Sequence, residues 1–268
     1  MNGVKTISDI RYGADDGFHM LDLYLPEGKD EFLTMIYFHG GGLELYTGGL
    51  ENDPNVPSDY SGSKMDSAKF LPAICADQGI AIATVDYRLY PDAKFPDFIE
   101  DVAEATAWVM ENIHNYGKSK KFVVCGSSAG AYLAMMLCFD KKYLGKFGID
   151  SYSLAGYIFD GGQPTAHFNT LRERGINTKR IVIDETAPLY HLDEVTQNPP
   201  MLFIVAEHDM PNRNEQNQFM LSVMEYLGYQ NVEHKVMAGF VHSAYCWKIE
   251  SDGTSKFGNA FKSFLNTL

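Results

Sequence analysis

A serine flanked by glycines is the residue of this chain best suited to act as a nucleophile. Ser128 lies in the run Gly126-Ser127-Ser128-Ala129-Gly130, which follows the apolar residues 122–125 and precedes the helix-like residues 131–137. Glycines two residues to either side permit a sharp strand-to-helix turn, because they carry no Cβ. Such a turn places the hydroxyl at a helix N-terminus, where backbone N–H groups stabilise negative charge. The pattern therefore predicts a nucleophile at Ser128.

Ser128 needs a base and an orienting acid, because a serine hydroxyl alone is a weak nucleophile. In open α/β sheets, functional residues follow the carboxyl ends of the strands. Asp209 leaves the apolar run 201–205, and His242 follows the last expected strand. Serine, then aspartate, then histidine is a known chain order for a catalytic triad. We therefore expect His242 to be the base and Asp209 to be the acid.

Two other carboxylates compete with Asp209 for the role of the acid. Asp160 also ends an expected strand and is the main rival, although it could instead bond the backbone of the glycines that follow it. Glu207 lies two residues before Asp209. The other histidines fit the role of the base less well. Three of them lie beside polar segments and are expected at the surface: His19, His114 and His234.

A run of glycines follows another buried strand. His39-Gly40-Gly41-Gly42 comes directly after the apolar residues Met35–Phe38. Glycines at a strand end leave backbone N–H groups uncovered and free to turn inward, where they could bind the oxyanion formed during acyl transfer. A further donor is expected from the N–H of Ala129, the residue after the nucleophile. The two glycine motifs together indicate acyl-transfer chemistry.

Strand-like and helix-like segments alternate along the chain, which predicts a mostly parallel sheet with helices on both faces. The expected strands are Ile7–Tyr12, Met20–Leu25, Met35–Phe38, Ile80–Val85, Phe122–Cys125, Leu154–Phe159, Met201–Val205 and Val232–Met237. The expected helices are Ser67–Gln78, Phe98–Asn115, Ala131–Asp140, Glu215–Leu227 and Lys256–Leu265. Apolar residues alternate with Asp22 and Tyr24 in the second strand, which is typical of a half-exposed antiparallel edge.

Two regions do not follow this alternation. Residues 45–64 are polar and read as a long loop, and residues 163–200 carry only short helical pieces. Long loops in compact domains are usually functional, so we expect both to roof the active site, within one domain (1–268) that carries a small cap. Aromatic residues there and near the C-terminus are candidates for the rim of the site: Tyr46, Tyr60, Phe168, Tyr190, Tyr245 and Trp247.

The composition argues against several classes of partner. The formal net charge is −13 and the pI is about 5.0, so the chain should repel nucleic acid and anionic membrane surfaces. The four cysteines have no metal-ligand spacing, and neither a metal nor a cofactor is expected. No apolar run reaches the ~18 residues of a membrane span, and no signal peptide is visible. We expect a cytoplasmic protein with a small-molecule substrate; whether it is a homo-oligomer stays open.

In these motifs the chain resembles the α/β hydrolases, and specifically the carboxylesterases related to hormone-sensitive lipase. The resemblance extends from about residue 19 to the C-terminus. It rests on these residues: His39-Gly40-Gly41-Gly42, Asp86-Tyr87-Arg88-Leu89 with Pro91, Phe95-Pro96, Gly126 to Gly130, Glu207-His208-Asp209, and His242. It implies an α/β-hydrolase fold with an eight-stranded type of sheet. It also implies hydrolysis through an acyl-enzyme, with an oxyanion hole formed by Gly41, Gly42 and Ala129.

The resemblance also limits the substrate class. Ser127 stands where lipase-like relatives often carry Asp, and Ala131 stands where many carry Gly. Because few residues precede the first expected strand, we do not expect the large N-terminal cap of the family. These departures favour short-chain acyl or aryl esters over long-chain lipids, with acetylated sugars as one candidate. Two alternatives remain. One is an amide-cleaving relative, such as a serine peptidase or an arylformamidase, and the other is a non-catalytic ligand-binding protein.

Overall fold

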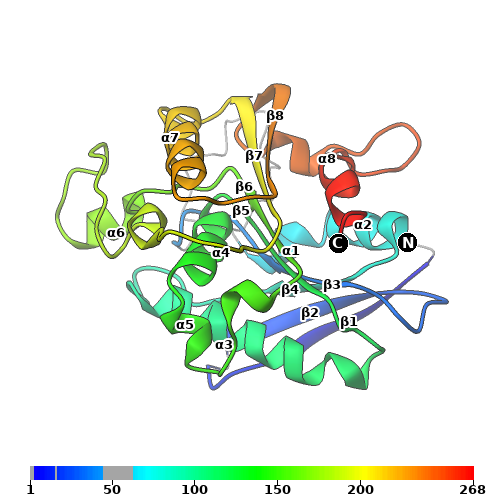
Figure 1. The fold of residues 1–268 in the computed structure, drawn as a ribbon. Helices are drawn as coiled ribbons and strands as arrows, with labels where there is room; N and C mark the ends of the chain where they lie inside the picture. Colours follow the sequence, from blue (N-terminus) through cyan, green and yellow to red (C-terminus); the bar gives the residue numbers. More distant parts are fainter. Residues whose placement is uncertain (1–2, 16, 45–62) are drawn as a thin grey trace.

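An eight-stranded sheet forms the centre of the molecule (Figure 1). The structure is a computed structural model that describes residues 3–15, 17–44 and 63–268. The strand order in the sheet is β1-β2-β4-β3-β5-β6-β7-β8. The strands are β1 (Val4–Arg11), β2 (Met20–Pro26), β3 (Thr34–Phe38), β4 (Ala81–Val85), β5 (Phe122–Ser127), β6 (Gly156–Asp160), β7 (Met201–His208) and β8 (Val232–Val241).

The sheet is mostly parallel. Neighbouring strands from β4 to β8 pair in parallel, whereas β2 pairs antiparallel with both β1 and β4. Parallel pairing brings the carboxyl ends of the strands that precede Gly40, Ser128 and Asp209 to one edge of the sheet. The mostly parallel sheet predicted from the alternation of segments is therefore confirmed, and it has the eight strands that the resemblance implies.

Helices cover both faces of the sheet. Helices α3, α4 and α7 contribute to the core on one face, and α2 and α8 contribute to the core on the other. Figure 1 shows α2 and α8 together on the side away from α3, α4 and α5. The helices are α1 (Lys64–Ser67), α2 (Leu71–Gln78), α3 (Asp97–Asn112), α4 (Ala129–Phe139), α5 (Lys142–Gly145), α6 (Phe168–Glu173), α7 (Arg213–Tyr226) and α8 (Lys256–Leu265).

Successive side chains of the central strands enter opposite cores. In β3, Ile36 and Phe38 belong to the core beneath α3 and α4, while Met35 and Tyr37 belong to the core beneath α2 and α8. This follows from the two-residue period of a β-strand. Because both faces are covered, all five residues of β3 are buried, which explains why the strand reads as an unbroken apolar run.

Two details of the predicted elements are wrong. Strand β2 pairs antiparallel as expected, but it is not a half-exposed edge, because β1 takes the edge position and both Asp22 and Tyr24 are buried. The helix predicted over residues 67–78 is divided between α1 and α2. Pro72 lies in the first turn of α2, the part of a helix in which the missing N–H of proline is tolerated.

His19 is buried rather than at the surface. Its ring stacks on Tyr12, and its Nε2 lies 3.2 Å from an Asp101 oxygen. Asp101 also accepts hydrogen bonds from Arg88 Nε at 2.9 Å and Nη2 at 2.6 Å. Arg88 therefore forms a half-buried ion pair with Asp101, and this pair links the turn before α3 to α3 itself.

All four cysteines are buried as free thiols. Cys125 lies in β5 and Cys138 lies in α4, each within an apolar core. Burial raises the pKa of the Cys75 thiol to about 12, and it raises the pKa values of the other three well above the usual range. The thiols therefore remain protonated and unreactive in the folded chain.

Helix α4 approaches the sheet so closely that glycine is required at two positions. A Cβ added to Gly130 would lie 2.1 Å from the carbonyl oxygen of Phe38 in β3. A Cβ added to Gly126 would lie 2.2 Å from the carbonyl oxygen of Gly130. Both contacts involve backbone atoms, which cannot move aside without disturbing the sheet or the helix. The two glycines flanking Ser128 are thus needed for packing as well as for the turn.

Gly130→Ala is expected to destabilise the protein by at least about 3 kcal/mol, because the added methyl group overlaps the β3 backbone. Gly145→Ala is the matched control, since Gly145 is exposed in α5 with open space around its Cβ position. That change should be neutral or stabilising by up to about 1 kcal/mol. Urea unfolding of both variants measures the difference, and equal effects would contradict the packing requirement.

Candidate active site

Ser128 occupies a strained turn between β5 and α4. Its backbone angles are φ 55° and ψ −114°, which non-glycine residues rarely adopt. Its N–H donates to the carbonyl oxygen of Asp160 at 2.7 Å, which fixes the turn to the end of β6. Helix α4 starts at Ala129, two residues earlier than predicted, so the Ser128 side chain lies directly at a helix N-terminus.

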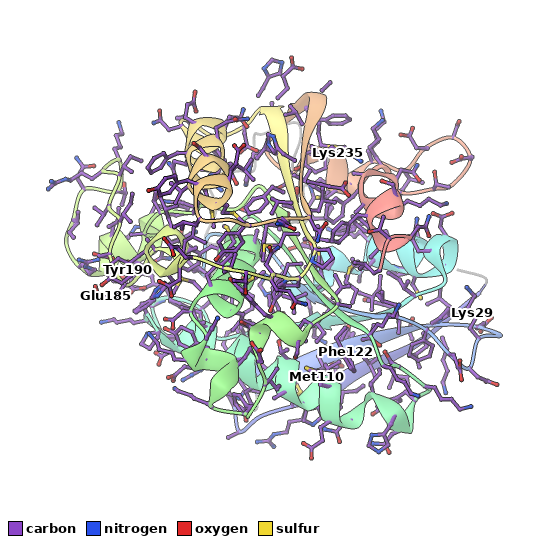
Figure 2. All side chains as sticks on the ribbon, in the orientation of Figure 1. Lys29, Met110, Phe122, Glu185, Tyr190 and Lys235 are labelled. Carbon is purple, nitrogen blue, oxygen red and sulfur yellow. The ribbon has the colours of Figure 1, made fainter. Side chains whose placement is uncertain are left out.

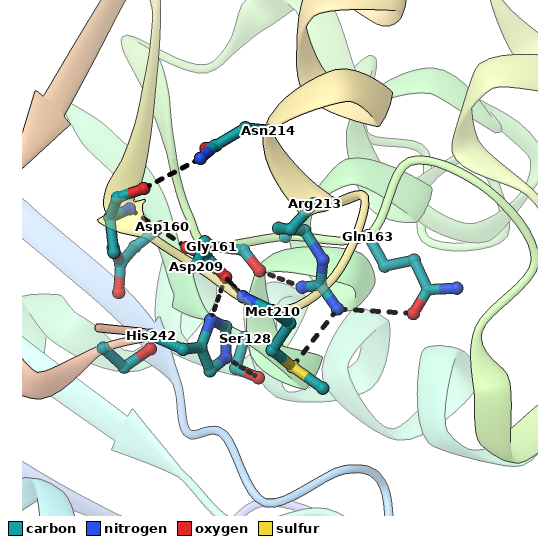
Figure 3. Close-up of polar contacts among 12 residues, drawn as sticks. Ser128, Asp160, Gly161, Gln163, Asp209, Met210, Arg213, Asn214 and His242 are labelled. Carbon is teal, nitrogen blue, oxygen red and sulfur yellow. Dashed lines mark hydrogen bonds and ion pairs between the residues drawn. The ribbon is translucent and has the colours of Figure 1, made fainter. Parts of the chain in front are cut away.

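Three side chains that are distant in the sequence form one hydrogen-bonded chain (Figure 3). His242 Nε2 lies 2.8 Å from Ser128 Oγ, and His242 Nδ1 lies 2.6 Å from Asp209 Oδ1. Because an ionised carboxylate only accepts hydrogen bonds, Nδ1 carries a proton and Nε2 can accept the serine proton. The structure thus brings together all three residues that the sequence suggested for a triad.

The surroundings of Asp209 favour its ionised form. Burial opposes ionisation, but the hydrogen bond and charge of His242 outweigh it, with help from the N–H groups of Ala206 at 3.0 Å and Met210 at 2.7 Å. The pKa of Asp209 is therefore below its usual value. Its side chain is fully buried, whereas that of His242 is 21% exposed, as expected if the imidazole faces a substrate.

The two rival carboxylates do not contact His242 in this way. Glu207 is exposed and accepts a hydrogen bond from the N–H of Gly239 at 2.7 Å. Asp160 is fully buried and accepts hydrogen bonds from the hydroxyls of Ser127 and Tyr245. Its bonds therefore go to side chains rather than to the adjacent glycines.

The glycine run after β3 has the backbone geometry expected of an anion-binding loop. Gly41 and Gly42 adopt φ angles of 112° and 73°, which favour glycine. Within the described part of the chain, the N–H groups of Gly41, Gly42 and Ala129 donate to no acceptor. Asn169 Nδ2 donates to the carbonyl oxygen of Gly42 at 3.1 Å, which holds the loop against α6.

Comparisons with known proteins identify the family of the chain. The BD-FAE family model matches residues 21–223, which is more than half of the chain. The chain belongs to the BD-FAE family. This membership, together with the relatives and solved structures that match, confirms the resemblance to α/β-hydrolase carboxylesterases.

Curated relatives of this BD-FAE chain match only in part. An ethyl acetate hydrolase from Pseudomonas putida is 29% identical over 136 residues, which cover 49% of this chain and 38% of that protein. A kynurenine formamidase from Danio rerio is 28% identical over 134 residues, which cover 50% of this chain and 39% of that protein. The matched part of this chain therefore spans less than two fifths of either relative.

One solved structure matches over nearly its whole length. It is a truncated form of a carbohydrate esterase from gut microbiota, with a TM-score of 0.76 and 17% sequence identity. The match covers 98% of this chain and 95% of that chain. At this level of identity the likeness concerns the fold alone.

The aromatic residues suggested for the rim differ in their positions. Phe168 lies beside the glycine run, with its Cζ 3.1 Å from the Cβ position of Gly42, and Tyr190 is 58% exposed on the cap-like segment (Figure 2). The prediction that Tyr245 lies at the rim is wrong, because its side chain is fully buried against Phe257. Trp247 packs edge-on against Phe70. Two further candidates lie outside the described residues: Tyr46 and Tyr60.

The sequence did not single out Arg213, a buried cation near the triad of this BD-FAE family member. Its guanidinium donates to the carbonyl oxygen of Gly161, and its Nη2 lies 3.4 Å from Gln163 Oε1 and 3.7 Å from Met210 Sδ (Figure 3). Burial lowers the pKa of Arg213 to about 10, against the charge of Asp209. An arginine at the start of a helix usually points to solvent, so no sequence pattern marks this one.

No metal site is evident in the described ranges. Residues 3–15, 17–44 and 63–268 contain no group of three or more His, Cys, Asp or Glu side chains arranged to hold a metal ion. In the same ranges no helix is long and apolar enough to cross a membrane.

Asp160→Asn is expected to change how stability depends on pH. Burial raises the pKa of Asp160 to about 6, against hydrogen bonds from Ser127 and Tyr245 and the charge of His242. The native state therefore binds this proton more tightly than the unfolded state, so stability falls as pH rises from about 4 to about 6. Between pH 4 and 7, the free energy of unfolding of the wild type should fall by up to about 3 kcal/mol relative to that of Asp160→Asn.

Urea unfolding of both proteins at several pH values measures this difference. Because other carboxylates titrate equally in the two proteins, only the change in the difference reports on Asp160. A difference that stays constant from pH 4 to 7 would contradict the raised pKa.

Proposed function

We propose that this protein is a serine carboxylesterase that hydrolyses short-chain acyl or aryl esters through an acyl-enzyme. The observation that carries the proposal is the hydrogen-bonded chain from Ser128 through His242 to Asp209. In this proposal Ser128 Oγ attacks the ester carbonyl carbon while its proton passes to His242 Nε2. Asp209 holds the imidazole in the required tautomer and stabilises the imidazolium that forms.

The glycine run and the helix N-terminus would stabilise the tetrahedral intermediate. Its oxyanion accepts hydrogen bonds from the N–H groups of Ala129, Gly41 and Gly42, which have no acceptor within the described chain. His242 then returns its proton to the leaving alcohol, and the acyl group remains on Ser128. A water molecule hydrolyses this acyl-enzyme by the same two proton transfers.

We infer that the substrates carry short acyl groups, and acetylated sugars are the more specific candidate. A relative named as an ethyl acetate hydrolase and a structural neighbour named as a carbohydrate esterase support this class. Phe168 and the exposed Tyr190 offer aromatic surface near the glycine run and on the cap-like segment. Aromatic faces of this kind commonly line small-molecule pockets.

An amide-cleaving activity is the second candidate function. The match to a kynurenine formamidase favours it, since that enzyme is named for a formamide substrate. The same three residues serve ester and amide cleavage, so geometry does not separate the two. A non-catalytic protein would not need the imidazole to be hydrogen-bonded to both a serine and a buried carboxylate.

Ser128→Ala should lower hydrolysis of 4-nitrophenyl acetate by at least about 10⁴-fold without changing the circular dichroism spectrum, because the nucleophile is lost. A fluorophosphonate probe should label the wild type and fail to label the variant. Turnover retained in Ser128→Ala would exclude Ser128 as the nucleophile.

Wild-type rates on phenyl formate and formanilide compare the two candidate functions, and preference for the formanilide would favour amide cleavage.

Asp209→Asn is expected to reduce kcat by about 10⁴-fold, because the amide disturbs the imidazole tautomer. Glu207→Gln is the matched control, since Glu207 is an exposed neighbour whose carboxylate contacts the Gly239 N–H and the exposed His208 ring rather than His242, and it should leave kcat within about twofold. Steady-state kinetics on 4-nitrophenyl acetate measures both variants. A larger loss in Glu207→Gln than in Asp209→Asn would reverse the choice of acid.

A further inference from the structure

Asp160 is a buried carboxylate that the proposed reaction does not use. Its side chain is fully inaccessible to solvent, and within the described residues no Lys, Arg or His nitrogen lies within 4 Å of it. It accepts hydrogen bonds from Ser127 Oγ and Tyr245 Oη, and Cys246 Sγ lies 3.5 Å from Oδ2. Burying a carboxylate without a cation in contact costs free energy, so its presence calls for a function other than stability.

The donors to Asp160 come from both sides of the candidate active site. Ser127 immediately precedes Ser128 and is the register partner of Asp160 across β5 and β6. Tyr245 and Cys246 belong to the short helical turn η4 (Ala244–Trp247), which begins two residues after His242. The carboxylate therefore connects the strand that carries the serine to the turn that follows the histidine.

The backbone around Asp160 also lies against the imidazole. Its carbonyl oxygen accepts the N–H of Ser128 at 2.7 Å. The next residue, Gly161, is so close to His242 that an added Cβ would lie 2.9 Å from His242 Cε1. A shift of the end of β6 would thus move both the turn that carries Ser128 and the Gly161 backbone that packs against the His242 ring.

We propose that Asp160 is a positioning residue that holds the His242 loop against the serine turn. It fixes the loop through Tyr245 and Cys246, and it fixes the turn through Ser127 and the N–H of Ser128. A misplacement of about 1 Å in a reacting group can cost on the order of 10²-fold in rate. The inference rests on the proposed function, because it assumes that His242 accepts the serine proton.

The carboxylate of residue 160 and the hydroxyl of residue 127 could exchange places within this cluster. Ser127 Oγ lies 3.3 Å from Ser243 Oγ and 3.9 Å from Cys246 Sγ, so a carboxylate at position 127 would meet the same loop. A serine hydroxyl at position 160 would then donate to that carboxylate, as the Ser127 hydroxyl now donates to Asp160. If the role is to connect the strand and the loop, either arrangement should support activity.

The first test removes one connection without changing the carboxylate. Tyr245→Phe deletes the hydroxyl that donates to Asp160, and Tyr157→Phe is its control, a fully buried tyrosine in β6 whose hydroxyl donates to the carbonyl oxygen of Ser151 at 2.8 Å. Tyr245→Phe should lower kcat for 4-nitrophenyl acetate by about tenfold or more with KM within about twofold. Tyr157→Phe should leave both constants within about twofold, even if its Tm falls equally.

The second test exchanges the pair. Asp160→Ser alone should lose about 10-fold to 100-fold in kcat, and Ser127→Asp with Asp160→Ser should recover at least about tenfold of that loss. A merely structural role predicts instead that activity follows Tm in every variant. If Asp160→Ser does not fold, the two tyrosine variants decide the question.

The outcomes separate the inference from the proposed function. A wild type that neither hydrolyses esters or formamides nor reacts with a fluorophosphonate would refute the proposed function. An active wild type with equal kcat in Tyr245→Phe and Tyr157→Phe, or with no recovery in the folded exchange variant, would refute the role of Asp160 alone. A loss specific to Tyr245→Phe together with recovery on exchange would establish it.

Discussion

The contact between the start of helix α4 and the end of strand β3 is the constraint on which the site depends. Because Gly126 and Gly130 carry no Cβ, the backbone of α4 can contact the backbone of the sheet directly, with Gly130 against the carbonyl oxygen of Phe38. This approach packs the start of α4 against the backbone of Phe38 and His39, the residues that lead into the glycine run. Larger side chains at positions 126 and 130 would push α4 away from the sheet. They would thereby move Ser128 away from the N–H groups of the glycine run.

Two neighbouring parallel strands carry an aspartate at their carboxyl ends, with Asp160 the last residue of β6 and Asp209 the first residue after β7. Their surroundings shift the pKa values of the two carboxyl groups in opposite directions. Asp209 receives two backbone N–H bonds and a bond from His242, which together outweigh the cost of burial. Asp160 receives bonds from neutral hydroxyls, and burial prevails. The same residue type thus favours the ionised form beside the imidazole and the protonated form at the end of β6, because only the environment differs.

Much of this arrangement can be predicted from the sequence, because period-two alternation and unbroken apolar runs identify strands, and parallel strands share a functional edge. The meeting of Ser128, Asp209 and His242 follows from that rule. The burial of Tyr245 and Arg213 does not, because both look like ordinary surface residues until the packing of η4 and α7 is known. The choice between carboxylates likewise depends on side-chain directions at the ends of β6 and β7.

The buried thiols have a practical consequence for handling this protein. The thiolate is the form that attacks alkylating reagents, and every cysteine of the chain is both buried and held in its protonated form. Iodoacetamide should therefore modify the chain only as fast as the core opens. The rate of carbamidomethylation, followed by mass spectrometry, would then measure the opening of the two cores on either side of the sheet, since Cys138 reports on one and Cys75 on the other.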